Sequence, residues 1–339
     1  MSAVPADLAE RFSPVPMFDL PHDQLIVYRS AARVPDDIEE FWGDTLTTAR
    51  ELSSPPTLTP VSTGLELAET WDVAFTGFGG DVVRGWLHRP VGRAEVLPAV
   101  VHYQGYGGGR GLAHQVPLWV LAGYACLEVD VRGQGSGYSF GDTPDPVGSG
   151  PAHPGFMTRG LLAPEDYYYR RVYTDSVLAV DVMRDLPGVD STRIAVCGGS
   201  QGGGIALAVA GLRNDLAAVV ADVPFLSDFR RGAEVAAKAP YTEIAAYLKI
   251  HRHHVEQAFR TLAYFDTCTL GQRATAPAMF SVGLMDETCP PSTVYAAYNA
   301  YAGPKRMVEY AFNDHEGGGP FHELEALSFL AERFAASAS

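Results

Sequence analysis

The fold of this chain is decided at residues 194–207, which read IAVCGGSQGGGIAL. A short apolar run opens the stretch and predicts a buried strand, and the apolar residues from Ile205 onward predict a helix. Between them, glycines surround Ser200. A serine on a sharp strand-to-helix turn is the context of the G-x-S-x-G nucleophile elbow, in which Gly198 and Gly202 accommodate a strained backbone. The alternative is an ordinary glycine-rich turn, so the motif needs partners elsewhere in the chain.

Short apolar runs spaced by helices continue on both sides of this stretch. Buried strands are predicted at residues 98–103, 125–130, 217–221 and 278–282, and helices at 116–122, 174–186 and 205–212. Buried runs of this length separated by helices are typical of a mostly parallel sheet with helices on both faces, so the sequence predicts an α/β fold. Ahead of them, residues 70–75 and 82–88 flank a glycine-rich turn and predict a β-hairpin.

The same pattern suggests how the chain is divided. Residues 1–60 are expected to form a polar N-terminal extension with helical character, and residues 61–339 the α/β domain. Residues 133–170, rich in Gly, Pro and aromatics, are too long for a plain connection and predict a functional loop. Residues 226–270 predict a helical insertion that covers the carboxyl edge of the sheet, where loops shape the pocket of such folds.

Composition and charge exclude several functional classes. The chain has 339 residues, 47% of them hydrophobic, and a formal net charge of -15. That charge argues against binding to nucleic acid or to anionic membranes, because both require a positive surface. The N-terminus lacks the pattern of a secretory signal and no segment is apolar for long enough to span a membrane, so we expect a cytoplasmic protein. The four cysteines are widely spaced, without a C-x-x-C pair, and are expected to be reduced.

Ser200 requires two partners. A serine hydroxyl is a poor nucleophile at neutral pH, so it needs a base, and the base needs a group that orients it. In α/β hydrolases the chain order is Ser, acid, His. Asp286 and His315 each follow a predicted strand, the second of which spans residues 307–312. Their positions and their order agree with a catalytic triad.

Two other carboxylates remain alternatives for the acid. Glu287 is adjacent to Asp286, and Asp314 is adjacent to His315. Asp286 could also be only the N-cap of a helix. Chain order and loop position favour Asp286 over all of these alternatives.

The oxyanion hole is expected to use two backbone N–H groups. One belongs to Gln201, the residue after the nucleophile, and the other to the loop at residues 104–111, QGYGGGRG, where we expect Tyr106 to be the donor. The glycines of this loop let its backbone approach a ligand. The chain has no G-x-x-x-x-G-K-[ST] and no G-x-G-x-x-G in a dinucleotide-binding context, so we expect no nucleotide cofactor.

A metal site is not expected either. His251, His253 and His254 invite that interpretation, but their spacing on a predicted helix does not bring all three onto one face. An exposed or packing role is favoured. His102 and His114 flank the glycine-rich loop, and either a supporting role near the site or plain packing is open for them.

Several motifs together resemble the acetylxylan esterase and cephalosporin C deacetylase family, carbohydrate esterase family 7. They are GYGGGRG at 105–111, RGQGSG at 132–137, GGSQGG at 198–203 and HE at 315–316, with MFDLP at 17–21 and EEFW at 39–42 near the N-terminus. The resemblance therefore covers nearly the whole chain. It implies an α/β-hydrolase fold and a cytoplasmic, cofactor-free serine esterase that removes acetyl groups from small substrates such as acetylated xylo-oligosaccharides and cephalosporin C.

The resemblance also implies roles for particular residues. It implies a triad of Ser200, Asp286 and His315, with Tyr106 and Gln201 as the oxyanion donors, and residues 132–134 as a scaffold in which the Arg132 guanidinium holds loops near the site. It further implies a ring-like homohexamer.

The chain departs from the family pattern at two places, and both leave its substrate preference open. Relatives are expected to carry Gly-Tyr-Asn-Gly where this chain has GYGG at 105–108, and three glycines follow His315 at 317–319. The alternatives are a general short- to medium-chain carboxylesterase, a lipase with a broad apolar pocket, a peptidase and an inactive binding protein.

Overall fold

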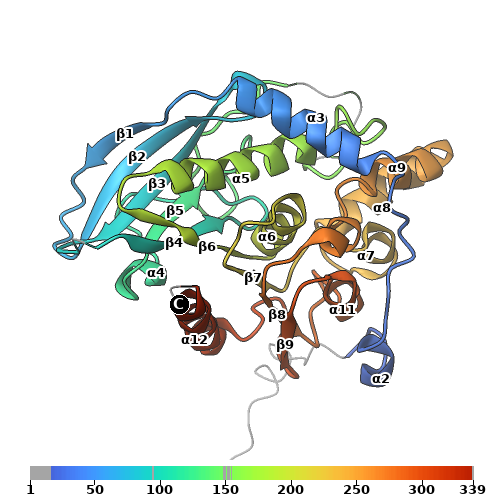
Figure 1. Ribbon diagram of the computed structural model, residues 1–339. Helices are drawn as coiled ribbons and strands as arrows, with labels where there is room; N and C mark the ends of the chain where they lie inside the picture. The colour runs from blue at the N-terminus through green and yellow to red at the C-terminus, as the bar shows by residue number, and fades with distance from the viewer. Residues whose placement is uncertain (1–16, 94, 148–149, 151–152, 154, 338–339) are drawn as a thin grey trace, which may run out of the picture.

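A computed structural model describes residues 17–93, 95–147, 150, 153 and 155–337 of the chain. At its centre lies one nine-stranded sheet (Figure 1). The strands, in spatial order, are β1 (Thr57–Val61), β2 (Ala68–Thr76), β3 (Val82–Pro90), β5 (Ala125–Val129), β4 (Leu97–Tyr103), β6 (Val189–Gly199), β7 (Ala218–Asp222), β8 (Ala278–Gly283) and β9 (Lys305–Tyr310). From β5 to β9 all pairings are parallel, whereas β1, β2, β3 and β5 pair antiparallel. The mostly parallel sheet predicted from the sequence is confirmed.

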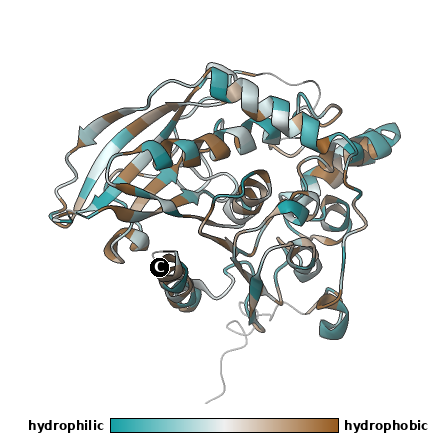
Figure 2. Cartoon of the chain, viewed as in Figure 1, coloured by the Kyte–Doolittle hydropathy of each residue, from teal (hydrophilic) through white to brown (hydrophobic). Residues whose placement is uncertain are grey.

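Helices cover both faces of this sheet, as expected. One face packs against α3 (Ile38–Glu51), α5 (Tyr168–Asp185), α6 (Gln201–Leu212) and α11 (Pro291–Ala300), and the other against α4 (Leu118–Leu121) and α12 (Gly319–Ala336) (Figure 1). Successive residues of β4 show why: Val101 belongs to the first apolar cluster and Val100 to the second, and both are fully buried. Figure 2 shows hydrophobic residues concentrated in the central strands and α6, with hydrophilic residues along the outer α3.

The predicted insertion at 226–270 is helical. It contains α7 (Phe229–Val235), α8 (Tyr241–Ile250), η3 (Arg252–His254), α9 (Val255–Leu262) and α10 (Thr267–Leu270). These helices gather beside α6 and α11 (Figure 1). The division of the chain into an extension, a domain and an insertion stays a prediction.

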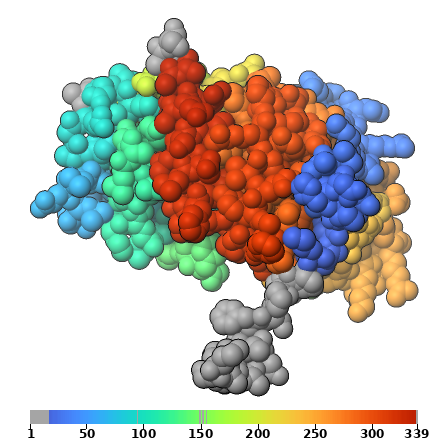
Figure 3. Space-filling view, turned by 90° about the horizontal axis from the view of Figure 1, so that it is seen from below, coloured from blue at the N-terminus to red at the C-terminus, as the bar shows by residue number. Residues whose placement is uncertain are grey.

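The N-terminal extension is only partly helical. Its described part holds α2 (His22–Leu25) and α3, but residues 57–61 form the edge strand β1, where a helical extension to residue 60 was predicted. The sequence of β1, TLTPV, is exposed or half-buried throughout, so no apolar alternation signals the strand. Residues 1–16 lie outside the described residues. Figure 3 shows the N-terminal segment in blue against the C-terminal half, where the Asn299 side chain donates to the carbonyls of Ile26 and Tyr28.

Several element boundaries differ from the predictions. Helix α5 begins at Tyr168, six residues before the predicted 174, because its tyrosines are buried and hydrogen-bonded: the hydroxyl of Tyr168 donates to the Arg132 carbonyl and that of Tyr169 to the Gln201 side chain. Strand β6 begins at residue 189 instead of 194, and β9 spans 305–310 instead of 307–312. Helices α11 and α12 were not predicted.

Two expectations about the whole chain can be compared with the structure. Among the described residues, no helix combines the length and the apolarity needed to cross a membrane. All four cysteines are buried and unpaired, namely Cys126, Cys197, Cys268 and Cys289.

A buried histidine in β3 makes the stability of the fold depend on pH. His88 is fully buried, its Nδ1 lies 3.0 Å from the Thr70 hydroxyl oxygen, and its Nε2 has no hydrogen-bond partner among the described residues. Burial lowers the pKa of His88 to about 4. In the unfolded chain the pKa returns to about 6.5. Between about pH 4 and pH 6.5 the imidazole is therefore protonated in the unfolded state but not in the folded state. Stability is therefore full above pH 6.5 and falls as the pH drops toward 4.

Replacing this histidine by an apolar residue removes that dependence. Between pH 7 and pH 5, we expect the wild-type free energy of unfolding to fall by about 2 kcal/mol more than that of the His88→Leu variant. Urea unfolding of both proteins at the two pH values measures the difference. An equal loss in the two proteins would show that His88 does not titrate as its burial demands.

Candidate active site

The candidate nucleophile lies on a strained turn between β6 and α6. Ser200 has φ 56° and ψ -118°, a backbone conformation that non-glycine residues rarely adopt and that persists only when the surroundings impose it. Its N–H donates to the Asp222 carbonyl (2.8 Å), and its carbonyl accepts from the N–H groups of Phe225 (2.9 Å) and Gly204 (3.0 Å). The turn is thus fixed by backbone hydrogen bonds to the adjacent strand and helix.

The glycines on either side of Ser200 leave no room for side chains. A Cβ atom at Gly202 would lie 2.1 Å from the Tyr103 carbonyl oxygen, and one at Gly198 would lie 2.6 Å from the backbone of Gly202. This close approach of β4, β6 and α6 explains why the motif requires glycine at both positions.

Ser200, His315 and Asp286 form one hydrogen-bonded chain. His315 Nε2 lies 2.9 Å from Ser200 Oγ, and His315 Nδ1 lies 2.8 Å from Asp286 Oδ2. The other carboxylate oxygen of Asp286 accepts the backbone N–H groups of Thr288 and Cys289, both at 2.8 Å. With its Nδ1 proton facing Asp286, His315 presents Nε2 as the acceptor for the Ser200 hydroxyl proton.

Both alternative acids are engaged elsewhere. Asp314 Oδ2 accepts from Lys238 Nζ (2.9 Å) and its Oδ1 accepts the Glu287 N–H (3.2 Å). Glu287 forms an ion pair with the same Lys238 at 3.1 Å. Neither carboxylate has a side-chain contact with His315 among the described hydrogen bonds.

Asp286, Cys289 and His315 also lie close enough together to hold a metal ion. His315 uses both ring nitrogens, one toward Asp286 and one toward Ser200, so neither is left for a metal ion. The histidine and the carboxylate are already hydrogen-bonded to each other. This donor set favours the hydrogen-bonded chain over a metal centre.

The two predicted oxyanion donors belong to segments that meet at the elbow. Gln201 is the first residue of α6, so its N–H has no acceptor within the helix. Tyr106 belongs to the loop after β4, and this loop touches the elbow: a Cβ at Gly105 would lie 3.8 Å from the Gly199 carbonyl. The backbone hydrogen bonds of the described residues include none donated by Tyr106 or Gln201 N–H. Both groups are therefore available to a ligand.

Gln134 connects these two donor segments. Its Oε1 accepts the Gly107 N–H (2.7 Å), and its Nε2 donates to the Gln201 side chain (2.8 Å) and to the Tyr168 hydroxyl (3.0 Å). The Gln201 amide in turn donates to the Gln104 carbonyl (3.1 Å). One buried glutamine thus fixes the spacing of the loop that carries Tyr106 and the helix that begins at Gln201.

Arg132, two residues before Gln134, contacts residues further from the site. Arg132 donates through Nε and Nη2 to both carboxylate oxygens of Asp175 (2.6 and 2.8 Å) and through Nη1 to Asp81 (3.1 Å). Its buried guanidinium therefore ties the β2–β3 turn to α5. The expected scaffold at residues 132–134 is present, but Gln134 is the residue that contacts the site.

The Tyr106 side chain is fixed by two contacts. Its hydroxyl donates to Glu243 Oε1 (2.7 Å) and accepts the Phe156 N–H (2.6 Å). Burial and the adjacent Glu243 raise the pKa of this phenol well above its usual range, so it stays protonated. Loop 133–170 and the helical insertion, to which Phe156 and Glu243 belong, both contribute to this support.

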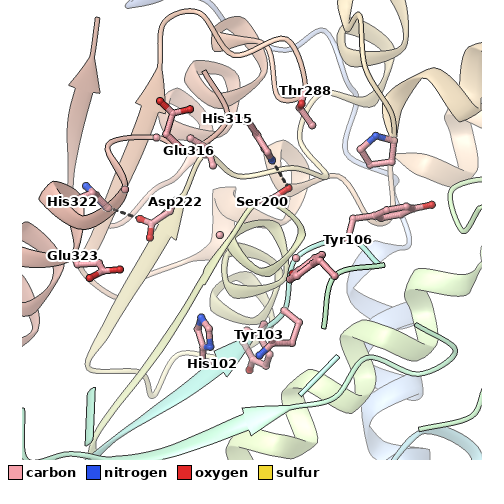
Figure 4. Close-up of a pocket in the computed structure, with 18 of the residues that line it drawn as sticks. His102, Tyr103, Tyr106, Ser200, Asp222, Thr288, His315, Glu316, His322 and Glu323 are labelled. Atoms are coloured by element: carbon pink, nitrogen blue, oxygen red, sulfur yellow. Dashed lines mark hydrogen bonds and ion pairs between the residues drawn. The ribbon is translucent and has the colours of Figure 1, made fainter. Parts of the chain in front are cut away.

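Ser200 and His315 line a cavity of about 640 Å³. Figure 4 shows Tyr106 and Thr288 on one side of Ser200, and Asp222, His322 and Glu323 on the other. Ala239 and Pro240 also line the cavity and follow Ala237 and Lys238, whose N–H groups donate to the Glu287 carbonyl next to Thr288, so the first side is mainly apolar, whereas the second is charged.

Two further histidine–carboxylate pairs belong to this cavity. His322 Nε2 lies 2.6 Å from Asp222 Oδ1, and His102 Nδ1 lies 2.8 Å from Glu128 Oε2. Burial alone would lower the pKa of His102, but the charge and hydrogen bond of Glu128 outweigh it and raise the pKa overall. His102 therefore lines the site, which is one of the two roles left open by the sequence.

The three histidines of the insertion do not form a metal cluster with the described residues. His251 follows α8, and the other two lie in η3 instead of on one longer helix as predicted. The rings of His251 and His254 stack at 5.2 Å, and His254 Nδ1 lies 2.9 Å from the Tyr247 hydroxyl. Their contacts fit the packing role expected from the sequence.

Sequence reasoning placed Gln134 in an expected scaffold but missed the other residues that support and line the site. Glu243, Asp222 and His322 belong to no motif that gives their contacts. For Asp222 a signal existed: it ends a predicted buried strand, and polar residues at the carboxyl ends of parallel strands meet at the active edge of such a sheet.

Comparisons with known proteins identify relatives of this chain. The family model described as "Acetyl xylan esterase (AXE1)" matches residues 15–333. The chain is 27% identical over 296 residues to the acetyl esterase Axe7A of Xylanibacter ruminicola, covering 83% of this chain and 63% of that protein. It therefore spans less than two thirds of that curated relative.

Solved structures extend the comparison over the whole chain. An acetyl xylan esterase from Paenibacillus sp. R4 is 37% identical, with a TM-score of 0.86 over 92% of this chain and 99% of that one. Acetyl xylan esterase 1 from Thermoanaerobacterium sp. JW/SL YS485 is 33% identical, with a TM-score of 0.85 over 93% and 99%. The acylaminoacyl peptidase of Pyrococcus horikoshii, at 17% identity and a TM-score of 0.56 over 80% and 42%, shares the α/β-hydrolase fold alone.

Proposed function

Since the chain belongs to the acetyl xylan esterase family, we propose that it is a serine carboxylesterase that removes acetyl groups from small acetylated substrates. The observation that carries the proposal is the continuous hydrogen-bonded chain from Ser200 through His315 to Asp286, at the edge of a cavity open to substrate. Acetylated xylo-oligosaccharides and cephalosporin C are the candidate substrates. The reaction needs no cofactor.

The mechanism proceeds in two halves. Ser200 Oγ attacks the acetyl carbonyl while His315 Nε2 takes its proton, and the Asp286 carboxylate stabilises the imidazolium. The N–H groups of Tyr106 and Gln201 hold the negative charge that develops on the carbonyl oxygen. His315 then protonates the leaving alcohol, which leaves an acetyl group on Ser200. In the second half His315 takes a proton from water, the hydroxide attacks the acetyl carbonyl, and acetate leaves as Ser200 regains its proton.

The acyl side of the cavity favours a short chain. Tyr106 stands beside Ser200 with its hydroxyl fixed between Glu243 and Phe156, so it cannot turn aside without losing two hydrogen bonds. Pro240 and Thr288 complete this side of the cavity. This fixed wall is the basis for proposing that a short acyl chain is accommodated better than a long one.

We expect acetyl esters to be preferred over longer acyl esters. Initial rates with p-nitrophenyl acetate, butyrate and octanoate should give kcat/KM for acetate at least about tenfold above that for octanoate, the discrimination that a fixed pocket wall provides against added methylenes. A preference for butyrate or octanoate would favour the alternative of a general short- to medium-chain carboxylesterase. Acetate release from acetylated xylo-oligosaccharides and from cephalosporin C then compares the two candidate substrates.

The proposal also includes a cytoplasmic homohexamer, as the family resemblance implies. Light scattering on the purified protein measures the assembly. A monomer or dimer at micromolar concentration would contradict the hexamer without affecting the proposed chemistry.

A further inference from the structure

The charged side of the cavity carries carboxylates from three different segments. Asp222 ends β7, Glu316 follows His315 in the loop after β9, and Glu323 lies in the first two turns of α12. The described residues that line the cavity include no lysine and no arginine. Figure 4 shows Asp222 and Glu323 on the same side of Ser200, with the Glu316 carboxylate above them in this view. We call these three residues the carboxylate wall.

Pairing within the protein cancels only part of this negative charge. His322 is held between Asp222 (2.6 Å) and the Tyr310 hydroxyl (3.0 Å), so a proton on its ring offsets one carboxylate at most. Glu316 accepts only from the uncharged Asn313 amide (2.7 Å), and no ion pair of Glu323 occurs in the described part of the chain. Two members of the wall therefore keep their full charge.

Neighbouring charged groups do not neutralise the carboxylate wall. Lys238 precedes Ala239, which lines the cavity, and it already bridges Asp314 (2.9 Å) and Glu287 (3.1 Å). His102 forms an ion pair with Glu128, which cancels its charge when it is protonated. The potential in the cavity is therefore negative, and the formal charge of -15 on the whole chain acts in the same direction.

The wall lies where the alcohol part of the substrate must go. The acetyl methyl group makes no hydrogen bonds and fits the side lined by Tyr106, Ala239 and Pro240. The leaving alcohol must receive a proton from His315, and it then extends toward the opposite side, where Asp222 and Glu323 stand.

We propose that the carboxylate wall makes this esterase select its leaving group by charge, preferring acetyl esters of cationic alcohols over neutral ones and disfavouring anionic ones. This inference rests on the proposed esterase function and adds the substrate class. The ring of Tyr138 also lines the cavity, and an aromatic face attracts a cation. Cephalosporin C, which carries a net negative charge, is then the poorer of the two candidate substrates.

A matched set of acetate esters isolates the effect of charge. Acetylcholine and 3,3-dimethylbutyl acetate have the same shape and differ by one positive charge, and acetylcholine has no N–H that could undergo acetyl migration. Each uncompensated carboxylate near a partly exposed cation is worth about threefold, so kcat/KM for acetylcholine should exceed that for the neutral ester about tenfold at low salt. The anionic ester 4-acetoxybutanoate should fall below the neutral one. Raising the salt to about 0.5 M should shrink both differences by screening.

The residues of the wall are tested by a double variant and a matched control. In the double variant Glu316→Gln/Glu323→Gln, the ratio of kcat/KM for acetylcholine to kcat/KM for the neutral ester should fall toward one. The control is Glu332→Gln, which removes one charge from the same helix, nine residues beyond Glu323 and outside the lining of the cavity; its ratio should equal that of the wild type. Because each ratio is taken within one protein, partial misfolding of a variant does not alter it.

The outcomes separate this inference from the proposed function. If the wild type hydrolyses the neutral ester and its kcat/KM for acetylcholine is no higher than that for the neutral ester, the proposed selection by charge is wrong and the esterase function stands. A high ratio that survives both the double variant and high salt would also overturn the assignment to the wall. If neither the neutral ester nor p-nitrophenyl acetate is hydrolysed, the proposed function itself fails.

Discussion

Replacing Ser200 by alanine is expected to lower kcat for p-nitrophenyl acetate by about five orders of magnitude. The hydroxyl is the atom that becomes acetylated, and the residue that remains can neither form the covalent intermediate nor pass a proton to His315. The rate left over reflects only substrate binding and the N–H groups of Tyr106 and Gln201. Steady-state assays with enzyme at high concentration measure so large a loss.

The Ser200→Ala variant also separates catalysis from folding. Its φ of 56° strains alanine as it strains serine, and the substitution removes only the side-chain hydrogen bonds to His315 and to the Cys289 thiol among the described contacts. The variant should therefore unfold at nearly the wild-type temperature. Activity that survives the substitution, with the fold intact, would mean that another group is the nucleophile.

Asp286→Asn is expected to cause the second largest loss, about three to four orders of magnitude in kcat. The asparagine carbonyl can keep the hydrogen bonds from the N–H groups of Thr288 and Cys289. Its amide then points at His315 Nδ1 and donates to it, which places the imidazole proton on Nε2, toward Ser200. A histidine in that tautomer cannot accept the serine proton.

The alternative acids provide the matched controls for this variant. Glu287→Gln and Asp314→Asn each remove one carboxylate that pairs with Lys238 instead of His315. Each should lower kcat by less than about tenfold, because only the field near the site changes. A loss at Asp314 as large as the loss at Asp286 would show that the acid has been assigned to the wrong residue.

The central sheet could be predicted from the sequence because its strands are buried on both faces. Runs such as residues 98–103 and 278–282 are mostly apolar, so their length and composition identify them as strands. The edge strand β1 escaped prediction because its TLTPV sequence is held by pairing with β2 and not by burial. The same holds at the start of α5, where tyrosine hydroxyls and not apolar periodicity fix the first turn.

The candidate site, like the fold, could be predicted only in part from the sequence. Ser200, Asp286 and His315 stand at loop positions that the chain order of this fold specifies, so the sequence could propose them, and the structure joins them by hydrogen bonds. Contacts such as Gln134 to Gln201 or His322 to Asp222 connect residues 67 and 100 positions apart. No local pattern encodes such contacts, since they depend on how loops pack at the sheet edge. The structure was therefore needed to find the carboxylate wall and the support of the oxyanion donors.

The central claim is that Ser200 is the nucleophile activated by His315, and covalent labelling tests it most directly. Diethyl p-nitrophenyl phosphate transfers one phosphoryl group to an activated serine and releases nitrophenol. We expect one label per chain, located by peptide mass spectrometry on Ser200, with activity lost in proportion to labelling and no label on Ser200→Ala. A label at another residue, or full activity after stoichiometric labelling of Ser200, would contradict the account.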